Sequence, residues 1–244
     1  MNPMLTIARR EFRSYFDSPL AYVVICLSLL GIGLMFFLYH GGFWQVDKAT
    51  VQGIFEWAPI GLATLVVPVV TMRLLAEERR SGTLEMLITL PVSDSDVILG
   101  KYFGALGLVL VVIASLLVYP IAMFRWPWNL GPLDWGPVTA GLLGLSLYSA
   151  ASVAIGLLVT ALTESQSIAF FVTFFVLASL WFVPEFVASA AGVQANVLEF
   201  VSFQTRLEGF ERGLIDTRDV VYFLSVTALA LAFAFRALER RKWA

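Results

Sequence analysis

The chain has 244 residues, of which 59% are hydrophobic and 14% are charged, and its formal net charge is −2. This composition is too hydrophobic for a soluble domain. No basic patch lies outside the segments that flank the apolar runs, so no nucleic-acid partner is predicted. The single cysteine, Cys26, excludes a disulfide framework and a thiolate metal site within the chain.

The first segment, residues 4–17, predicts an amphipathic helix. Apolar side chains occupy one half of the helical wheel and basic or polar side chains most of the other, while Glu11 lies on the apolar half. A basic amphipathic helix of this kind favours the headgroup plane of a membrane. Pro19 then ends the helix before the first apolar run. The alternative is a frayed basic tail, which the clustering of apolar residues on one face disfavours.

Six long apolar runs follow, and each predicts a membrane-spanning helix. A bilayer core about 30 Å thick requires about 20 apolar residues in helical form, and backbone polar groups in lipid must be satisfied within such a helix. The fifth run is short and becomes ambiguous after Pro184. The whole chain, 1–244, is therefore predicted to be one all-α integral membrane domain. The predicted spans cover residues 20–39, 57–75, 102–124, 138–162, 168–183 and 220–238.

The distribution of positive charge predicts the orientation of the chain. Most of the 16 Lys and Arg residues lie before the first span, between the second and third spans, or at the end of the chain. Because cytoplasmic segments are enriched in Lys and Arg, both termini are predicted to be cytoplasmic. The first run is too long for the apolar region of a signal peptide, so it is predicted to be an uncleaved span. The outer segments hold only Lys48, Arg125, Arg206, Arg212 and Arg218.

The interiors of the apolar runs contain no Asp, Glu, Lys or His. Arg73 and Arg236 lie close to run ends, where long side chains reach the interface. Ionisable residues inside a membrane usually mark ion paths or proton relays, so their absence argues against an ion pump, a proton-coupled carrier or a voltage sensor. His40 is the only histidine, which argues against a histidine-based triad or zinc site. The chain is predicted not to be an enzyme.

Proline and small residues inside the runs make further predictions. Pro68 and Pro120 indicate either broken helices that line a path or ordinary kinks in membrane helices. The fourth run is rich in Gly, Ala and Ser between Gly141 and Gly156, which favours close packing against another helix. The partner helix could belong to the same chain or to another subunit.

The most unusual stretch, residues 76–100, lies between the second and third spans. A dense charge cluster leaves the second span, Ser81-Gly82-Thr83 interrupts the helix, and a short helix with an apolar face is predicted over 84–90 before Pro91. Ser93 and Asp96 then form a capping pattern at the start of the next helix. A short cytoplasmic helix with one charged and one apolar face suits docking into a groove of a partner protein.

The string EERRSGTLEML, from Glu77 to Leu87, resembles a motif of ABC-2 type transporter permeases, E-E-[KR]-x-x-G-T-x-E-x-L-L-x-x-P. Pro91 follows it, and Met86 is a mild departure from the leucine-like residue common there. The resemblance extends over the whole chain, because the family also has an N-terminal amphipathic helix, six spans and a longer outer segment before the last span. Within the family, the chain most resembles the gliding-motility-associated permeases and the permeases of nitrous-oxide reductase maturation.

The resemblance implies the membrane subunit of an ATP-binding cassette transporter in the bacterial inner membrane. Residues 82–90 would be its coupling helix, and ATP and Mg would bind to a separate cytoplasmic ATPase present in two copies. The chain itself has no G-x-x-x-x-G-K-[ST] motif for binding ATP phosphates. The residues implied to contact the ATPase are Glu77, Glu78, Gly82, Thr83, Glu85, Leu87 and, in the turn between the fourth and fifth spans, Glu164.

The resemblance also implies further partners. These are a second permease copy or a homologous permease, membrane lipids, and an auxiliary protein with a periplasmic domain. It further implies that residues 192–219 dip partly into the outer leaflet as short helices, whereas the alternative is an ordinary loop. The uncharged spans favour lipid-linked, polymeric or mechanically coupled cargo over a small ion, and the substrate itself is not identified by the residues.

Two functions of other classes compete with the transporter hypothesis. A membrane scaffold or anchor would hold other proteins and move nothing, so the ATPase rate of a partner would not respond to it. A membrane enzyme acting on lipid would need converging polar groups, and the outer side offers only His40, Glu56 and Glu185.

Overall fold

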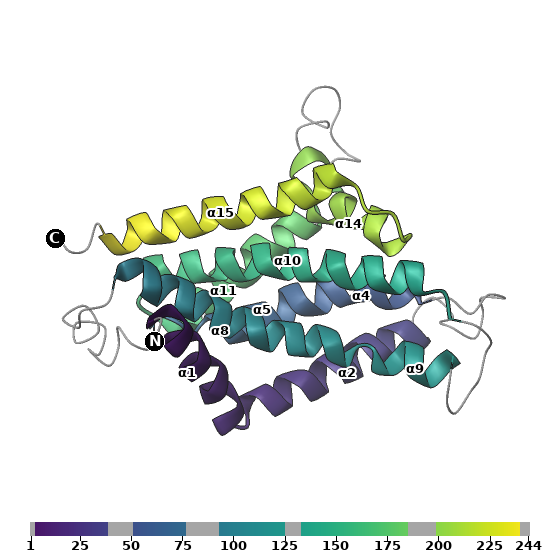
Figure 1. The fold of residues 1–244 in the computed structure, drawn as a ribbon, viewed down its shortest axis with the longest axis horizontal. Coiled ribbons are helices and arrows are strands. Elements are labelled where there is room, and N and C mark those ends of the chain that lie inside the picture. Colours follow the sequence, from purple (N-terminus) through teal and green to yellow (C-terminus); the bar gives the residue numbers. More distant parts are fainter. Residues whose placement is uncertain (1–2, 39–50, 77–92, 125–132, 185–198, 240–244) are drawn as a thin grey trace.

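The computed structural model describes residues 3–38, 51–76, 93–124, 133–184 and 199–239. Every regular element within these ranges is helical, and the long helices lie side by side in an elongated bundle (Figure 1). Helix α1 (Pro3–Asp17) begins and α15 (Thr217–Glu239) ends at the same end of this bundle, called the α1 end below. Helix α14 (Phe203–Glu211) lies toward the opposite end, called the α14 end.

The predicted N-terminal helix is confirmed as a helix, and its apolar side is partly covered by protein. Helix α1 packs lengthwise against the third membrane segment, and the side chain of Tyr15 is buried. The chain then turns at Ser18 and Pro19 into α2 (Leu20–Leu38), whose outward apolar side chains are exposed. A position of α1 in the membrane surface remains a prediction.

The second span differs from its predicted limits of 57–75. Its helical part begins with α4 (Gln52–Gly61), continues through a π-helical turn η2 (Leu62–Val66) and ends with α5 (Val67–Thr71). The amide of Val67 donates to the carbonyl of Leu62, five residues earlier. Pro68 has no amide hydrogen, so the turn before it cannot continue the regular hydrogen-bond ladder. Pro68 was predicted to mark either a broken helix or a kink, and the described residues favour a local irregularity within a continuous segment.

The third span starts well before its predicted limit of 102. Helix α8 (Asp94–Ser115) is capped by Ser93, whose hydroxyl accepts a hydrogen bond from the amide of Asp96 at 3.2 Å, as the capping pattern predicts. The segment is interrupted at residues 116–117 and resumes as α9 (Val118–Phe124). Pro120 accounts for the interruption, because its ring removes a hydrogen bond to the carbonyl four residues earlier.

Helix α10 (Trp135–Leu162) is the most buried long helix, and its small residues pack against other parts of the same chain. A Cβ atom added to Gly141 would lie 2.7 Å from the ring of Phe55, and one added to Gly144 would lie 2.6 Å from the Cβ of Phe210. The close packing predicted for this run is therefore confirmed, with its partner within the chain.

Five segments of the described residues are long and apolar enough to cross a bilayer, whereas six were predicted. The fifth predicted span, 168–183, corresponds to α11 (Gln166–Trp181), which has only 16 residues and is shorter than the roughly 20 that a perpendicular crossing requires. Its role as a sixth span remains a prediction. The five segments are Leu20–Leu38, Gln52–Thr71, Asp94–Phe124, Trp135–Leu162 and Thr217–Glu239.

Part of the predicted outer segment 192–219 is helical. The hydroxyl of Ser202 accepts a hydrogen bond from the amide of Thr205 at 3.2 Å and begins α14. Phe203, Leu207 and Phe210 are buried against neighbouring helices, of which α10 is the main one. The short helix implied by the family resemblance is present, and its partial entry into the outer leaflet remains a prediction.

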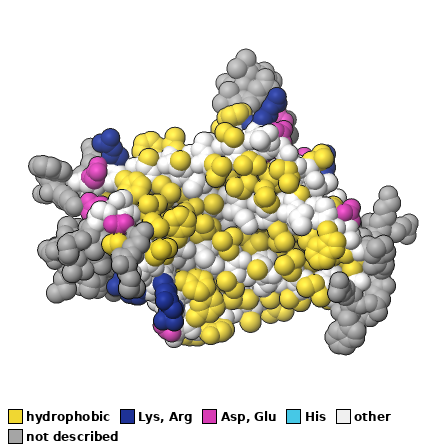
Figure 2. All heavy atoms as spheres, viewed as in Figure 1, with side chains coloured by type: hydrophobic (Ala, Val, Ile, Leu, Met, Phe, Trp, Pro, Cys, Tyr) yellow, Lys and Arg dark blue, Asp and Glu magenta, His cyan; other side chains and the backbone are white. Residues whose placement is uncertain are grey.

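The surface of the bundle matches a membrane environment. Hydrophobic side chains cover most of the middle of the visible face, and charged side chains gather toward its two ends (Figure 2). Leu30, Phe175 and Leu229 are among the large apolar residues with more than half of their surface exposed. An apolar band of this extent is costly in water and favourable in lipid.

Candidate functional site at the base of the predicted coupling segment

Most of the predicted ATPase-contacting residues lie outside the described residues. Glu77, Glu78, Gly82, Thr83, Glu85 and Leu87 all fall within 77–92. The structure does describe the chain on both sides of this segment, and it describes Glu164.

The two flanks of the predicted coupling segment lie at the α1 end. Helix α5 leads toward this end and α8 starts there (Figure 1). The last described residues before the segment are buried, since Leu74 is 2% exposed and Leu75 and Ala76 are fully buried. A segment that begins at buried residues is attached firmly to the bundle, so displacement of the segment would act on the helices themselves.

Glu164 is exposed and lies in the turn between α10 and α11, and this turn is at the same end of the bundle (Figure 1). Helix α10 ends at Leu162 because Thr163 adopts an extended backbone, and the Thr163 hydroxyl donates to the carbonyl of Val159 at 2.9 Å. Ser165 then precedes α11. The structure therefore brings the turn of Glu164 and the flanks of 77–92 to one end of the molecule.

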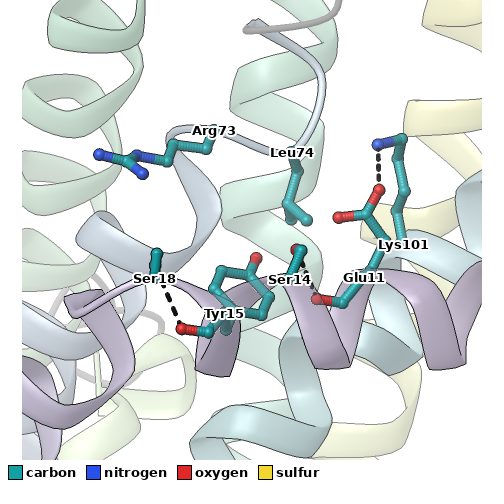
Figure 3. A pocket seen from close by; sticks show the side chains of 7 residues that line it. All are labelled: Glu11, Ser14, Tyr15, Ser18, Arg73, Leu74 and Lys101. Carbon is teal, nitrogen blue, oxygen red and sulfur yellow. Dashed lines mark hydrogen bonds and ion pairs between the residues drawn. The ribbon is translucent and has the colours of Figure 1, made fainter.

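A polar cavity of about 280 Å³ lies at this end, between α1, the turn after α5, and α8 (Figure 3). Residues of α1 spaced three or four apart share one face of the helix, which brings several polar groups to the same wall. The Ser14 hydroxyl donates to the Glu11 carbonyl at 2.7 Å, and the Ser18 hydroxyl to the Tyr15 carbonyl at 3.2 Å. The lining residues are Glu11, Ser14, Tyr15, Ser18, Arg73, Leu74 and Lys101.

A buried ion pair joins α1 to α8 beside this cavity. The Nζ atom of Lys101 donates to the Oε1 atom of Glu11 at 2.8 Å, and the two side chains are 2% and 15% exposed (Figure 3). An ammonium group buried among apolar helices requires a charged partner. This pairing explains the presence of Glu11 on the apolar half of α1.

Two glycines of α8 allow α1 to approach closely enough for this pair to form. A Cβ atom added to Gly104 would lie 2.6 Å from the Glu11 Cβ and 3.1 Å from the Ala8 carbonyl oxygen. One added to Gly100 would lie 2.8 Å from the Cβ of Ile7. Glycine at these positions lets the two backbones pack directly against each other.

Helix α1 also contacts the flank that precedes the coupling segment. The Tyr15 hydroxyl donates to the carbonyl of Val70 at 3.0 Å, and this hydrogen bond is buried. Val70 lies in α5, one residue before that helix ends. Helix α1 therefore holds a contact with each flank, through Tyr15 on α5 and through Glu11 on α8.

Glu11 and Lys101 were not predicted to be a pair, although two features of the sequence pointed to them. Glu11 is the acidic residue on the apolar face of the first helix, and Lys101 opens an otherwise apolar run. The capped start of α8 at Ser93 places Lys101 in the third turn of a helix rather than in a loop. An isolated acid and an isolated base in two apolar helix faces are candidates for pairing.

The α14 end holds a second ion pair. The Nη1 atom of Arg206 lies 3.0 Å from the Oδ1 atom of Asp219, and the two side chains are 19% and 14% exposed. The guanidinium of Arg206 also lies over the rings of Phe200, at 4.6 Å, and Tyr222, at 5.2 Å. These contacts tie the start of α15 to α14.

Glu211 at the same end has a perturbed acidity. Burial, followed by the negative charges of Glu56 and Glu208, raises the pKa of its carboxyl to about 7, and Arg212 opposes the shift. Among the described residues, no cluster of His, Cys, Asp and Glu could hold a metal ion.

A protein-family model matches most of the chain. The family model described as "ABC-2 family transporter protein" matches residues 57–235. The chain therefore belongs to this family. None of the curated proteins matches the chain. Members of this family are transmembrane subunits without ATPase activity of their own and act with a cytoplasmic ABC ATPase. The matched region includes Lys101 and begins after α1 and α2.

Proposed function

We propose that this chain couples ATP hydrolysis by a separate cytoplasmic ATPase to export or mechanical work across the membrane. The observation that supports this proposal is the gathering of three features at one end of the bundle. These are the flanks of the segment 77–92, the turn of Glu164, and the polar cavity beside α1. A partner that docks at this end could contact both predicted coupling elements at once.

The proposed mechanism is mechanical. Residues 82–90 would dock in a groove of the ATPase, with Glu77, Glu78 and Glu85 facing its surface and Leu87 in its groove. Closure of the ATPase on ATP would displace this segment and, through its buried flanks, the helices attached to it. Regular helices transmit displacement along their length, whereas irregular turns absorb it. The regular helix α8 would therefore carry the movement, and the π-helical turn η2 before Pro68 would bend.

The proposal includes a complete assembly. The α1 end would be cytoplasmic, α1 would lie at the membrane surface, and α11 would complete a set of six spans in a bacterial inner membrane. Two permease subunits, identical or homologous, would pair with two ATPase subunits that bind ATP and Mg. The motif EERRSGTLEML supports a place near the gliding-motility-associated permeases, with an auxiliary protein carrying a periplasmic domain.

The proposed cargo is large or lipid-linked. The visible face of the membrane segments is mostly apolar (Figure 2), and the buried charge of Lys101 is already paired with Glu11. Neither feature offers a site for a small hydrated ion.

The test is to purify the chain with its cognate ATPase in lipid nanodiscs and to measure binding and ATP turnover. Glu78→Ala, Gly82→Val and Glu85→Ala should each weaken the complex or abolish the response of the ATPase to the chain. Glu208→Ala, an exposed acidic residue at the α14 end, is the matched control and should leave both unchanged. Full binding and full ATP-dependent activity in the three variants would contradict the proposal. An ATPase rate indifferent to the wild-type chain would instead favour a scaffold.

A further inference from the structure

We infer that α1 is a clamp on the two flanks of the coupling segment, with Glu11 and Lys101 as its positioning residues. The inference rests on the proposed function, because it assigns a role in transmitting movement of residues 77–92. Its basis is that α1 contacts α8 through the pair of Glu11 and Lys101 and contacts α5 through Tyr15 (Figure 3).

The two contacts of the clamp differ in strength. On the α8 side, an ion pair of 2.8 Å is mostly buried and lies beside two glycines that bring the helix backbones together. On the α5 side, the contact is a neutral hydrogen bond of 3.0 Å from the Tyr15 hydroxyl to the carbonyl of Val70. Charge-assisted hydrogen bonds are stronger than neutral ones. Helices α1 and α8 should therefore move together, and α5 should be able to move relative to them.

The ion pair is better suited to fixing the position of α1 on α8 than to stabilising the fold. Two apolar residues of similar volume in place of a buried ion pair usually preserve stability. The attraction within an ion pair in a medium of low dielectric constant is larger and acts over a longer distance than an apolar contact, so it opposes separation of the two helices over a wider range. The pair also specifies one register, because only one placement of α1 along α8 brings Glu11 to Lys101.

The surroundings leave room for the movement that this inference requires. The cavity of about 280 Å³ lies between α1, Leu74 and α8, so the α5 flank, although buried against the rest of the bundle, faces a space on the side toward α1. In Figure 3, Leu74 projects between Arg73 and Lys101 at this cavity. The irregular backbone of the same segment, at η2 and at the turn after Thr71, further distinguishes this flank from the regular start of α8.

The experiment uses the full chain in complex with its cognate ATPase in lipid nanodiscs. It compares Glu11→Met/Lys101→Met, which replaces the ion pair by an apolar one, with Glu11→Lys/Lys101→Glu, which reverses it. Arg206→Met/Asp219→Met, the ion pair at the α14 end, is the matched control. Three quantities are measured for each variant: retention of the ATPase, unfolding temperature, and the increase in ATPase rate caused by the chain.

The variant with the apolar pair should retain the ATPase and have an unfolding temperature near that of the wild type. The increase in ATPase rate that it causes should be about tenfold smaller than that caused by the wild type. The reversed pair should recover most of that loss, because it restores the attraction. The control should retain stimulation. Full stimulation in the apolar pair would overturn the inference alone, leaving the proposed function intact. An ATPase rate that does not respond to the wild-type chain would overturn both.

Discussion

The two ends of the bundle each hold an ion pair, and the pairs are built differently. At the α14 end, Arg206 and Asp219 are 13 residues apart in sequence, and aromatic rings surround the guanidinium. At the α1 end, Glu11 and Lys101 are 90 residues apart, and Lys101 is almost fully buried in a helix that glycines bring against α1. The pair at the α14 end joins neighbouring parts of the chain, whereas the pair at the α1 end joins two parts that are distant in sequence.

This difference shows what each pair can control. A pair between neighbouring elements stabilises a turn and has little influence on helices elsewhere. A pair between distant elements constrains how the whole bundle can rearrange, because those elements have no short connection to hold them. The pair at the α1 end also lies outside the apolar middle of the bundle and near the predicted coupling segment, where a constraint on movement has the largest consequence.

The largest expected effect comes from breaking the buried pair on one side only. Lys101→Met removes the ammonium group closest to Glu11 and leaves a mostly buried carboxylate whose remaining ion-pair partner, the exposed Arg10, lies 3.9 Å away, so we expect a loss of about 3 kcal/mol in unfolding free energy. Thermal unfolding of the purified chain in detergent, followed by tryptophan fluorescence, measures it. Asp219→Asn at the α14 end should lower the unfolding free energy by less, because Arg206 keeps its contact with the ring of Phe200. Equal losses at the two ends would remove the contrast between them.

The close approach of α1 to α8 can be tested without changing any charge. Gly104→Leu would force atoms into the space occupied by the Glu11 Cβ and the Ala8 carbonyl, so we expect a loss of about 2–3 kcal/mol from overpacking. Gly31→Ala in α2 is the matched control, because no atom lies within 4 Å of its added Cβ. Its unfolding temperature should equal or exceed that of the wild type. A Gly104→Leu protein as stable as the control would refute the close packing.

The α14 end should show its own dependence on pH. Glu211 has a pKa raised from its ordinary value of 4.5 to about 7, so the folded chain holds this proton more tightly than the unfolded chain. Stability should therefore fall as pH rises from 4.5 to 7, by about 2 kcal/mol once solvent screening is allowed for. Glu211→Gln should remove this slope in unfolding measurements across that range, while Glu199→Gln, an exposed control, should retain it.

The smallest expected effect separates two tyrosine hydrogen bonds. Tyr15→Phe removes a buried bond to the Val70 carbonyl and should cost about 1 kcal/mol, because that carbonyl loses a buried donor. Tyr222→Phe removes an exposed bond to the Val201 carbonyl, and water can replace it. Its effect on the unfolding free energy should be close to zero. A larger loss in Tyr222→Phe would reverse the ranking of the two ends.

Much of the local structure could be predicted because its causes lie in neighbouring residues. The cap at Ser93, the helix over 3–17 and the close packing of the fourth run all follow from short patterns. The limits of the helices were less predictable. Apolar content placed the start of the third span at 102, whereas the cap at Ser93 starts α8 earlier, and the turn before Pro68 is π-helical, because backbone hydrogen bonding also sets the limits of a helix.

The amino-acid sequence alone determined that this is an all-helical membrane protein with the motif of a transporter subunit. Apolar runs of that length have no other stable conformation in lipid, because each backbone polar group must find its partner within its own segment. Only the packing of the helices decided that Glu11 pairs with Lys101 and that α1 contacts both flanks of 77–92. Contacts between residues so far apart depend on the relative placement of whole helices, and no local pattern encodes that placement.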